Sequence, residues 1–183
     1  MFSRAGWGAA ARQFSPAGES GLYDQQSNPT GWLEYPSPLA DQLQSLVIHH
    51  AALEFDHGPQ AIQRLHMLGR GFADVGYHYL IDGLGQLYEG RPIGVRGAHV
   101  GGHNTGAVGI CLLGNFEEVD PLVAQINTTR LLAGYLRDSY RLTHLAGHRD
   151  YQPDVTVCPG KTMWPLLPDL AAELGMTFGT PAG

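Results

Sequence analysis

The sequence predicts an α/β domain in which a mixed central β-sheet is covered by α-helices. Short apolar runs typical of buried strands alternate with longer stretches whose apolar residues recur at helical spacing. Some neighbouring elements are joined by a hairpin turn and others by crossover-length connections, a combination that is typical of a mixed sheet. A chain of 183 residues is long enough for one such domain.

Residues 1–43 read as an N-terminal arm that packs on or flanks the domain, which we place at residues 44–183. The arm is rich in Gly, Ser, Pro and Gln and has no sustained hydrophobic period. Trp7, Trp32 and Tyr35 are the side chains that we expect to hold the arm against the domain.

The first predicted strand, residues 46–50, is a short apolar run that ends in His49 and His50. Because side chains alternate across a strand, the two histidines must point to opposite faces and cannot share one role. An amphipathic helix is predicted at residues 59–69, where Pro59 suits the first turn.

A second predicted strand, residues 75–81, forms a hairpin with a third at residues 86–89, because a glycine-containing turn lies between them. Because side chains alternate along a strand, we expect Tyr77, Tyr79 and Ile81 to share one face of the second strand, and His78 and Leu80 the other. The segment that follows is rich in glycine and histidine, and predicts either a functional loop or an ordinary surface loop.

The last predicted strand, residues 107–114, is apolar throughout and suits the centre of a sheet. Cys111 within it is most simply a small buried hydrophobic residue. Helices are predicted at residues 121–140 and 163–174. Prolines in the first half of the last helix should confine regular hydrogen bonding to its later turns.

Composition excludes several classes of partner. The formal net charge is −6 and no basic run is present, which argues against nucleic-acid binding. No apolar run is long enough to span a membrane, so we expect no membrane insertion. The N-terminal residues lack the basic start and apolar core of a secretory signal. Cys111 and Cys158 lie in unlike settings and are not expected to form a disulfide.

Residues 147–160 place two metal-ligand types, His148 and Cys158, on one short loop. His49, at a strand end, supplies a third. Three protein ligands with one open position define catalytic zinc, and both imidazole nitrogen and thiolate sulfur suit that ion. Such a site lowers the pKa of bound water to about 7 and polarises carbonyl groups, which is the chemistry of amide or ester hydrolysis.

The order of these residues resembles the zinc-dependent type 2 N-acetylmuramoyl-L-alanine amidases, a family that includes phage lysozyme-like amidases and the peptidoglycan recognition proteins. The resemblance covers nearly the whole chain and implies the fold of that family. Seven collinear motifs carry it: SRAGWG at 3–8, VIHH at 47–50, VGYHYLI at 75–81, LYEGR at 87–91, GAH at 97–99, GI and GNF within 109–116, and GHR with CPG between 147 and 160.

The family's roles transfer by motif. The histidine after the VI pair, the GHR histidine and the CPG cysteine bind zinc, which implies His49, His148 and Cys158 as metal ligands. The GYH tyrosine implies a catalytic role for Tyr77, whose hydroxyl can hold the attacking water or donate to the oxyanion. Family members carry lysine or threonine two residues before the cysteine, which implies that Thr156 helps to stabilise the tetrahedral intermediate.

Substrate binding is implied for His50, His99 and Asn104, which resemble residues lining the family's groove. The chain departs from many recognition proteins by carrying Pro92 and Ile93 after the LYEGR motif, so the stem-peptide type does not transfer. It also lacks the cysteines of the disulfide near the middle helix of animal recognition proteins, which favours a bacterial or phage origin.

The resemblance implies a zinc hydrolase, with Zn²⁺ as cofactor and peptidoglycan as partner, that cleaves the amide bond between N-acetylmuramic acid and L-alanine of the stem peptide. Residues 44–183 would form its catalytic domain, and we expect a monomer. It would act on the cell wall, either extracellularly or in the periplasm, or as a phage lysin held in the cytoplasm until lysis.

Two alternatives stay open. One is a non-catalytic peptidoglycan-binding module of the same fold, although family members that only bind typically lose the cysteine that is Cys158 here. The other is a structural zinc site closed by a fourth protein ligand, for which His50 and Asp154 are candidates.

Overall fold

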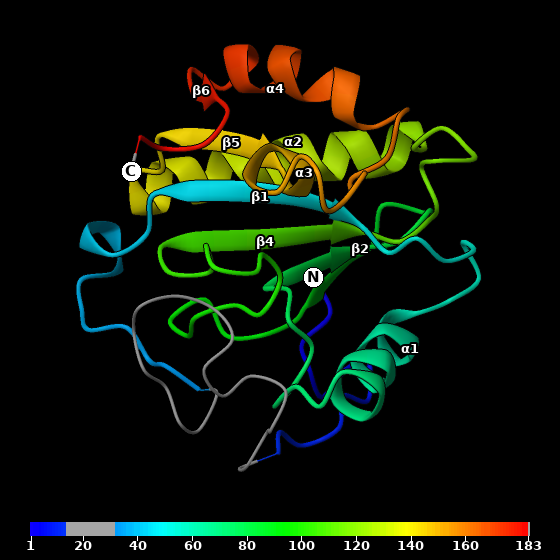
Figure 1. Ribbon diagram of the computed structural model, residues 1–183. Coiled ribbons are helices and arrows are strands. Elements are labelled where there is room, and N and C mark those ends of the chain that lie inside the picture. The colour runs from blue at the N-terminus through cyan, green and yellow to red at the C-terminus, as the bar shows by residue number, and fades with distance from the viewer. Residues whose placement is uncertain (14–31, 183) are drawn as a thin grey trace.

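A six-stranded mixed sheet with the strand order β3-β2-β4-β1-β5-β6 forms the centre of the molecule (Figure 1). The computed structural model describes residues 1–13 and 32–182. Strands β2 and β3 pair antiparallel and all other neighbours pair parallel. The predicted mixed sheet is therefore confirmed. The strands are β1 (Ser45–His50), β2 (Tyr79–Ile81), β3 (Leu87–Glu89), β4 (Ala107–Leu112), β5 (His144–Gly147) and β6 (Thr177–Phe178).

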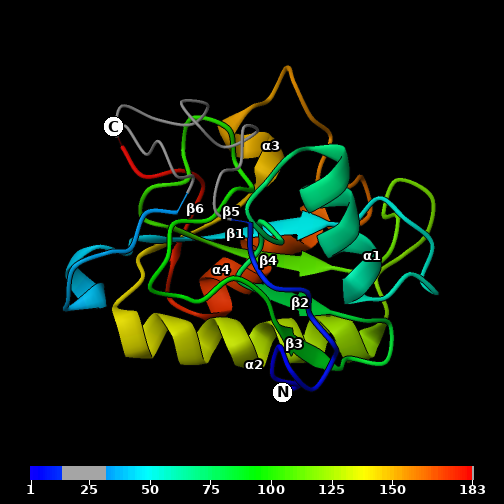
Figure 2. The ribbon, with the colours of Figure 1, turned by 90° about the horizontal axis from the view of Figure 1, so that it is seen from below.

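Helices cover both faces of this sheet. Helices α2 and α4 pack on one face over the larger apolar core, whereas α1 packs on the other through Ile62, which belongs to the same apolar cluster as Leu80 and Cys111. Figure 2 shows α2 along one side of the sheet and α1 and α3 on the opposite side. The helices are α1 (Pro59–Arg64), continued by the π-helical η2 (Leu65–Gly69), α2 (Val123–Tyr140), α3 (His148–Tyr151) and α4 (Leu167–Glu173), with the 3₁₀ turns η1 (Leu39–Asp41) and η3 (Trp164–Leu166).

Most predicted elements are present with altered bounds. The helix predicted at residues 163–174 begins as the 3₁₀ turn η3 and becomes α-helical only at Leu167, as its prolines require. Strand β5, helix α3 and the two-residue strand β6 were not predicted. All three are too short for a hydrophobic period to reveal.

The prediction that Tyr77 shares a strand face with Tyr79 and Ile81 is wrong. Regular pairing in β2 begins at Tyr79, and Tyr77 packs with Leu80 in the apolar cluster under α1. The amides of Gly90 and the residue after it donate to the consecutive carbonyls of His78 and Tyr77, at 2.8 Å each. Two consecutive bonds of this kind break the regular alternation of an antiparallel ladder, as a β-bulge does. The side chains of Tyr77 and Tyr79 therefore point to opposite faces of the sheet.

Both described ends of the 1–43 stretch contact the domain. Trp7 is buried, and its indole N–H donates to the Glu89 carbonyl at 2.8 Å. The Tyr35 hydroxyl accepts a bond from the Gly106 amide at 2.9 Å, and the Arg91 guanidinium lies over the Trp32 ring at 5.1 Å. The middle of the predicted arm, residues 14–31, lies outside the described residues, and the boundary at residue 44 stays a prediction.

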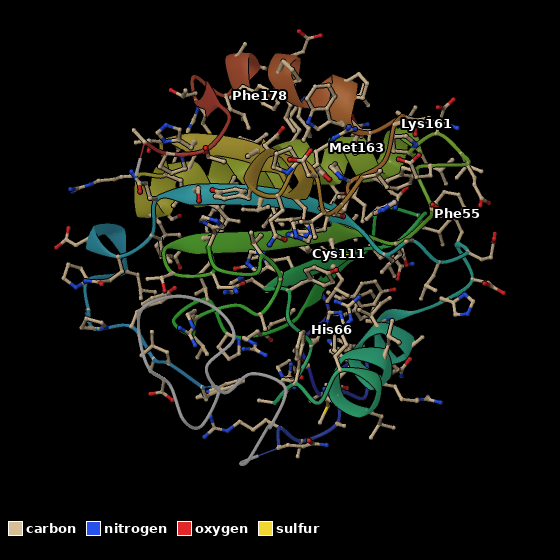
Figure 3. All side chains as sticks on the ribbon, in the orientation of Figure 1. Phe55, His66, Cys111, Lys161, Met163 and Phe178 are labelled. Atoms are coloured by element: carbon tan, nitrogen blue, oxygen red, sulfur yellow. The ribbon has the colours of Figure 1, made fainter. Side chains whose placement is uncertain are left out.

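Gly76 is packed so tightly that a methyl group there is expected to destabilise the fold. Its amide donates to Nδ1 of His66, which is labelled in Figure 3, at 2.9 Å, and a Cβ atom would lie 2.1 Å from the Ala98 carbonyl oxygen. Gly76→Ala should lower the free energy of unfolding by about 1–3 kcal/mol or more, as overpacking does. Chemical denaturation measures this. Gly58→Ala is the matched control, because a Cβ there meets nothing nearer than 3.7 Å; equal losses in both variants would contradict the argument.

Candidate metal centre

Parallel strand pairing brings the two predicted histidine ligands to one edge of the sheet. Strand β1 pairs with β5 so that Ile48 lies opposite Gly147. His49 follows Ile48 and His148 follows Gly147, so the two histidines are neighbours at the carboxyl ends of these strands. Ligands bind at these ends in open α/β sheets. The ring centroids of the two histidines are 4.8 Å apart.

Cys158 completes the cluster from the loop that follows α3. One ligand atom from each of His49, His148 and Cys158 lies within 4.8 Å of the others, and the Cys158 Sγ lies 3.7 Å from Nδ1 of His49. Ligand atoms bound tetrahedrally to zinc at its usual bond lengths lie roughly 3.3–3.6 Å apart. The donor types suit a zinc ion and the 3.7 Å separation is close to this range, so the three side chains can hold a metal.

Burial keeps both imidazoles neutral, as a ligand lone pair requires. The pKa of His49 is lowered well below its usual value of 6.5, first by burial and then by repulsion from His148 and His99. Burial likewise lowers the pKa of His148, although a hydrogen bond to Gln152 opposes the shift. At neutral pH neither ring has to lose a proton before it binds a metal.

The thiol of Cys158 is 8% exposed, and burial raises its pKa to about 12. The backbone amide of His50 donates to its sulfur, with an N···S distance of 3.4 Å, and this bond favours the thiolate. Cys158 must therefore lose its proton when it binds a metal, so binding is coupled to proton release.

Tyr77 lies beside the cluster, with its ring centroid 5.0 Å from that of His49. The residue keeps some exposed surface. Burial, followed by the thiols of Cys111 and Cys158, raises the pKa of Tyr77 well above 10, so its hydroxyl stays protonated and can donate. Cys111, on β4 in the interior (Figure 3), is fully buried as predicted and belongs to the apolar cluster against which Tyr77 packs.

Thr156 lies two residues before Cys158 and is partly exposed. Its hydroxyl oxygen accepts a bond from the Cys158 amide at 3.1 Å, which fixes the side chain beside the ligand loop. The hydroxyl proton is not used by that bond and remains available to a substrate oxygen.

The three residues with predicted substrate roles are all buried. His50, His99 and Asn104 are 6%, 8% and 0% exposed. Nδ1 of His50 accepts the Phe116 amide at 3.1 Å, and Oδ1 of Asn104 accepts the His99 amide at 2.7 Å. The side chains of His50 and Asn104 thus hold the protein's own backbone, and all three substrate-binding roles stay predictions.

Within the described part of the chain, neither His50 nor Asp154 joins the ligand cluster. His50 points to the opposite face of β1, toward Phe116, and Asp154 is exposed. Sequence reasoning missed Gln152, whose Oε1 lies 2.9 Å from Nε2 of His148. The spacing of four residues between the two was the available signal, but it has meaning only if the segment is helical.

Comparisons of the sequence with known proteins point to one family. The family model described as N-acetylmuramoyl-L-alanine amidase matches residues 39–161. Peptidoglycan-recognition protein SC2 of Drosophila melanogaster is 37% identical over 139 residues, which are 69% of this chain and 73% of that protein.

Two solved structures share the fold. The N-acetylmuramoyl-L-alanine amidase LysC from Clostridium intestinale is 30% identical with a TM-score of 0.69, over 85% of this chain and 97% of that one. The ectodomain complex of peptidoglycan recognition proteins LCa and LCx, solved with tracheal cytotoxin, gives 27% identity and a TM-score of 0.70, over 91% and 93% of the two chains. The chain therefore belongs to the N-acetylmuramoyl-L-alanine amidase family, which it shares with the peptidoglycan recognition proteins.

Proposed function

We propose that this protein is a zinc-dependent peptidoglycan hydrolase that cleaves the amide bond between N-acetylmuramic acid and L-alanine of the stem peptide. The observation that carries the proposal is the convergence of the His49, His148 and Cys158 donor atoms within 4.8 Å. Membership of the amidase family supports the reaction. The solved complex of peptidoglycan recognition proteins LCa and LCx with tracheal cytotoxin supports peptidoglycan as the partner.

The chain's own residues have separate roles in this proposal. His49, His148 and Cys158 hold the ion, and zinc bound in this way supplies a Lewis acid and a water of lowered pKa. Tyr77 donates its proton toward the carbonyl oxygen as that oxygen gains negative charge. The Thr156 hydroxyl is a second, neutral hydrogen-bond donor. Tyr77 therefore contributes more to stabilising the negative oxygen than it would if a charged lysine stood at position 156.

The complete set of three donors favours catalysis over binding alone. A module that only binds peptidoglycan has no need for a buried thiol aligned on two neutral imidazoles. A closed structural zinc site is also disfavoured, because in the described residues no fourth protein ligand joins the three.

The cell wall is the proposed place of action, because that is where the substrate lies. Within residues 1–13 and 32–182, none of the helices has the length and apolar character needed to cross a membrane.

Release of amino groups from purified cell walls tests the reaction directly. Incubation should generate one new amino-terminal L-alanine for each bond cut, identified by labelling the products and separating them. The heat-denatured protein provides the blank. If zinc-loaded protein sediments with the walls but yields no new amino-terminal alanine, the protein is a binding module and not an amidase.

Removal of the metal is expected to abolish this release and to lower stability. A ligand that binds only the folded state stabilises it by about 2.7 kcal/mol when its free concentration is 100 times its Kd. Dialysis against a chelator should therefore lower the Tm, and zinc should restore both the Tm and activity, whereas magnesium should not, since it prefers oxygen ligands. Undiminished activity at a zinc content near zero would contradict the proposal.

A further inference from the structure

The ring nitrogen of the proposed metal ligand His49 that points away from the metal cluster contacts a second histidine. Nε2 of His49 lies 3.0 Å from Nδ1 of His99. Because Nδ1 of His49 faces the Cys158 sulfur, its ring proton belongs on Nε2 and is donated to His99. His99 then carries its own proton on Nε2, which faces the Ala107 carbonyl at 3.4 Å. One set of tautomers satisfies the whole chain of contacts.

His148 has an equivalent support. Its Nε2 donates to Oε1 of Gln152 at 2.9 Å, which leaves Nδ1 for the metal cluster. The amide nitrogen of Gln152 in turn donates to the Gly101 carbonyl at 3.1 Å. Both imidazoles thus present Nδ1 to the cluster and have Nε2 engaged by a partner.

Both supports depend on one segment, residues 97–106, which we name the support loop. It supplies the His99 side chain and the Gly101 carbonyl. Fully buried Asn104 closes the loop, since its Oδ1 accepts the amides of His99 at 2.7 Å and Val100 at 2.9 Å.

Glycines fix the orientation of the His99 ring. A Cβ atom at Gly97 would lie 2.3 Å from Cδ2 of His99, and one at Gly109 would lie 2.7 Å from the same atom. The ring therefore fills the space left by two glycines, where it has little room to turn away from His49.

We propose that the support loop sets the tautomer and direction of both imidazole ligands, with His99 acting as a positioning residue for His49 and Gln152 for His148. The inference rests on the metal site of the proposed function but not on the reaction. Partners of this kind orient metal-bound imidazoles and raise their basicity, and their loss typically weakens metal binding by about 10–100-fold.

Pairs of variants with similar shape separate hydrogen bonding from packing. Leu and Asn in place of His99 have the same branching, but only Asn can accept a hydrogen bond from Nε2 of His49. Gln152→Met and Gln152→Glu are likewise similar in length, and only Glu keeps an acceptor for His148. Zinc affinity is measured by competition with a chromogenic chelator, and the visible spectrum of the Co²⁺-loaded protein reports ligand geometry.

The Leu and Met variants should bind zinc about 10–100-fold more weakly than the parent protein, with altered Co²⁺ spectra. The Asn and Glu variants should recover most of the affinity. Equal affinity within each pair would overturn the proposal, because packing alone would then account for the effect. Circular dichroism of the metal-free proteins checks folding. If His99→Leu does not fold, the Gln152 pair decides, since that side chain is only partly buried.

The two proposals fail in different ways. Zinc binding that is weakened in the Leu and Met variants and recovered in the Asn and Glu variants, together with no amide cleavage by the parent protein, would refute the amidase and support the positioning role. Active parent protein with unchanged zinc affinity in all four variants would refute the positioning role alone.

Discussion

Replacing Cys158 with serine is expected to remove both metal binding and amide hydrolysis. A hydroxyl is a far poorer zinc ligand than a thiolate, and the two remaining donors, from His49 and His148, leave the ion with half of a tetrahedral shell. Zinc affinity should fall by more than the roughly 100-fold that loss of an outer partner can cause, and release of amino groups should become undetectable. Metal analysis after dialysis and the cell-wall assay measure the two losses.

Cys111→Ala is the matched control for this variant. Cys111 is the other cysteine of the chain, and it is fully buried on β4 outside the donor set. This variant should keep one zinc ion per chain. Zinc content is the measurement to compare, because Cys111 packs near the proposed catalytic residue Tyr77 and its loss can also change activity. If Cys158→Ser retains zinc at the parent affinity, Cys158 is not a ligand and the proposed site is wrong.

The fold could be predicted where the local pattern and the final packing agree. Strand β1 is an apolar run buried on both faces, and its bounds differ from the prediction by one residue. Strand β5 has only 4 residues and includes a histidine and a glycine. It is a strand because it pairs with β1 on one side and β6 on the other, and that information is not local.

The candidate ligands could be named from the sequence because their residue types are specific for metals, His148 and Cys158 lie on one short loop, and His49 lies at the end of a predicted strand. Their supports could not. His49 and His99 are 50 positions apart, and their contact depends on the route of the support loop. Gln152 becomes a neighbour of His148 only through helix α3, which begins at His148. Such partners arise from tertiary contacts, whereas the ligands themselves are recognisable by type and position.

Phenylalanine in place of Tyr77 is expected to slow turnover by roughly 10 to 1,000-fold, the range found when one oxyanion donor is removed. The zinc content should not change, because Tyr77 lies beside His49 but its hydroxyl stays protonated, whereas zinc is bound by Cys sulfur, His nitrogen and carboxylate oxygen. The loss should fall on kcat more than on KM, since the bond to the oxygen forms chiefly as charge develops in the transition state. Rates with a soluble muropeptide, measured together with metal content, provide the comparison.

Tyr79→Phe makes the same chemical change on the other face of the sheet. Tyr79 packs against the core beneath α2 and α4 rather than against the metal cluster, so this variant should keep its kcat. Full activity in Tyr77→Phe would remove Tyr77 from the mechanism and leave Thr156 as the protein's proposed donor. A loss of zinc in parallel with activity would instead assign Tyr77 to the support of His49. Only slow turnover at full zinc occupancy, with Tyr79→Phe unaffected, identifies the Tyr77 hydroxyl as the group that stabilises the oxyanion.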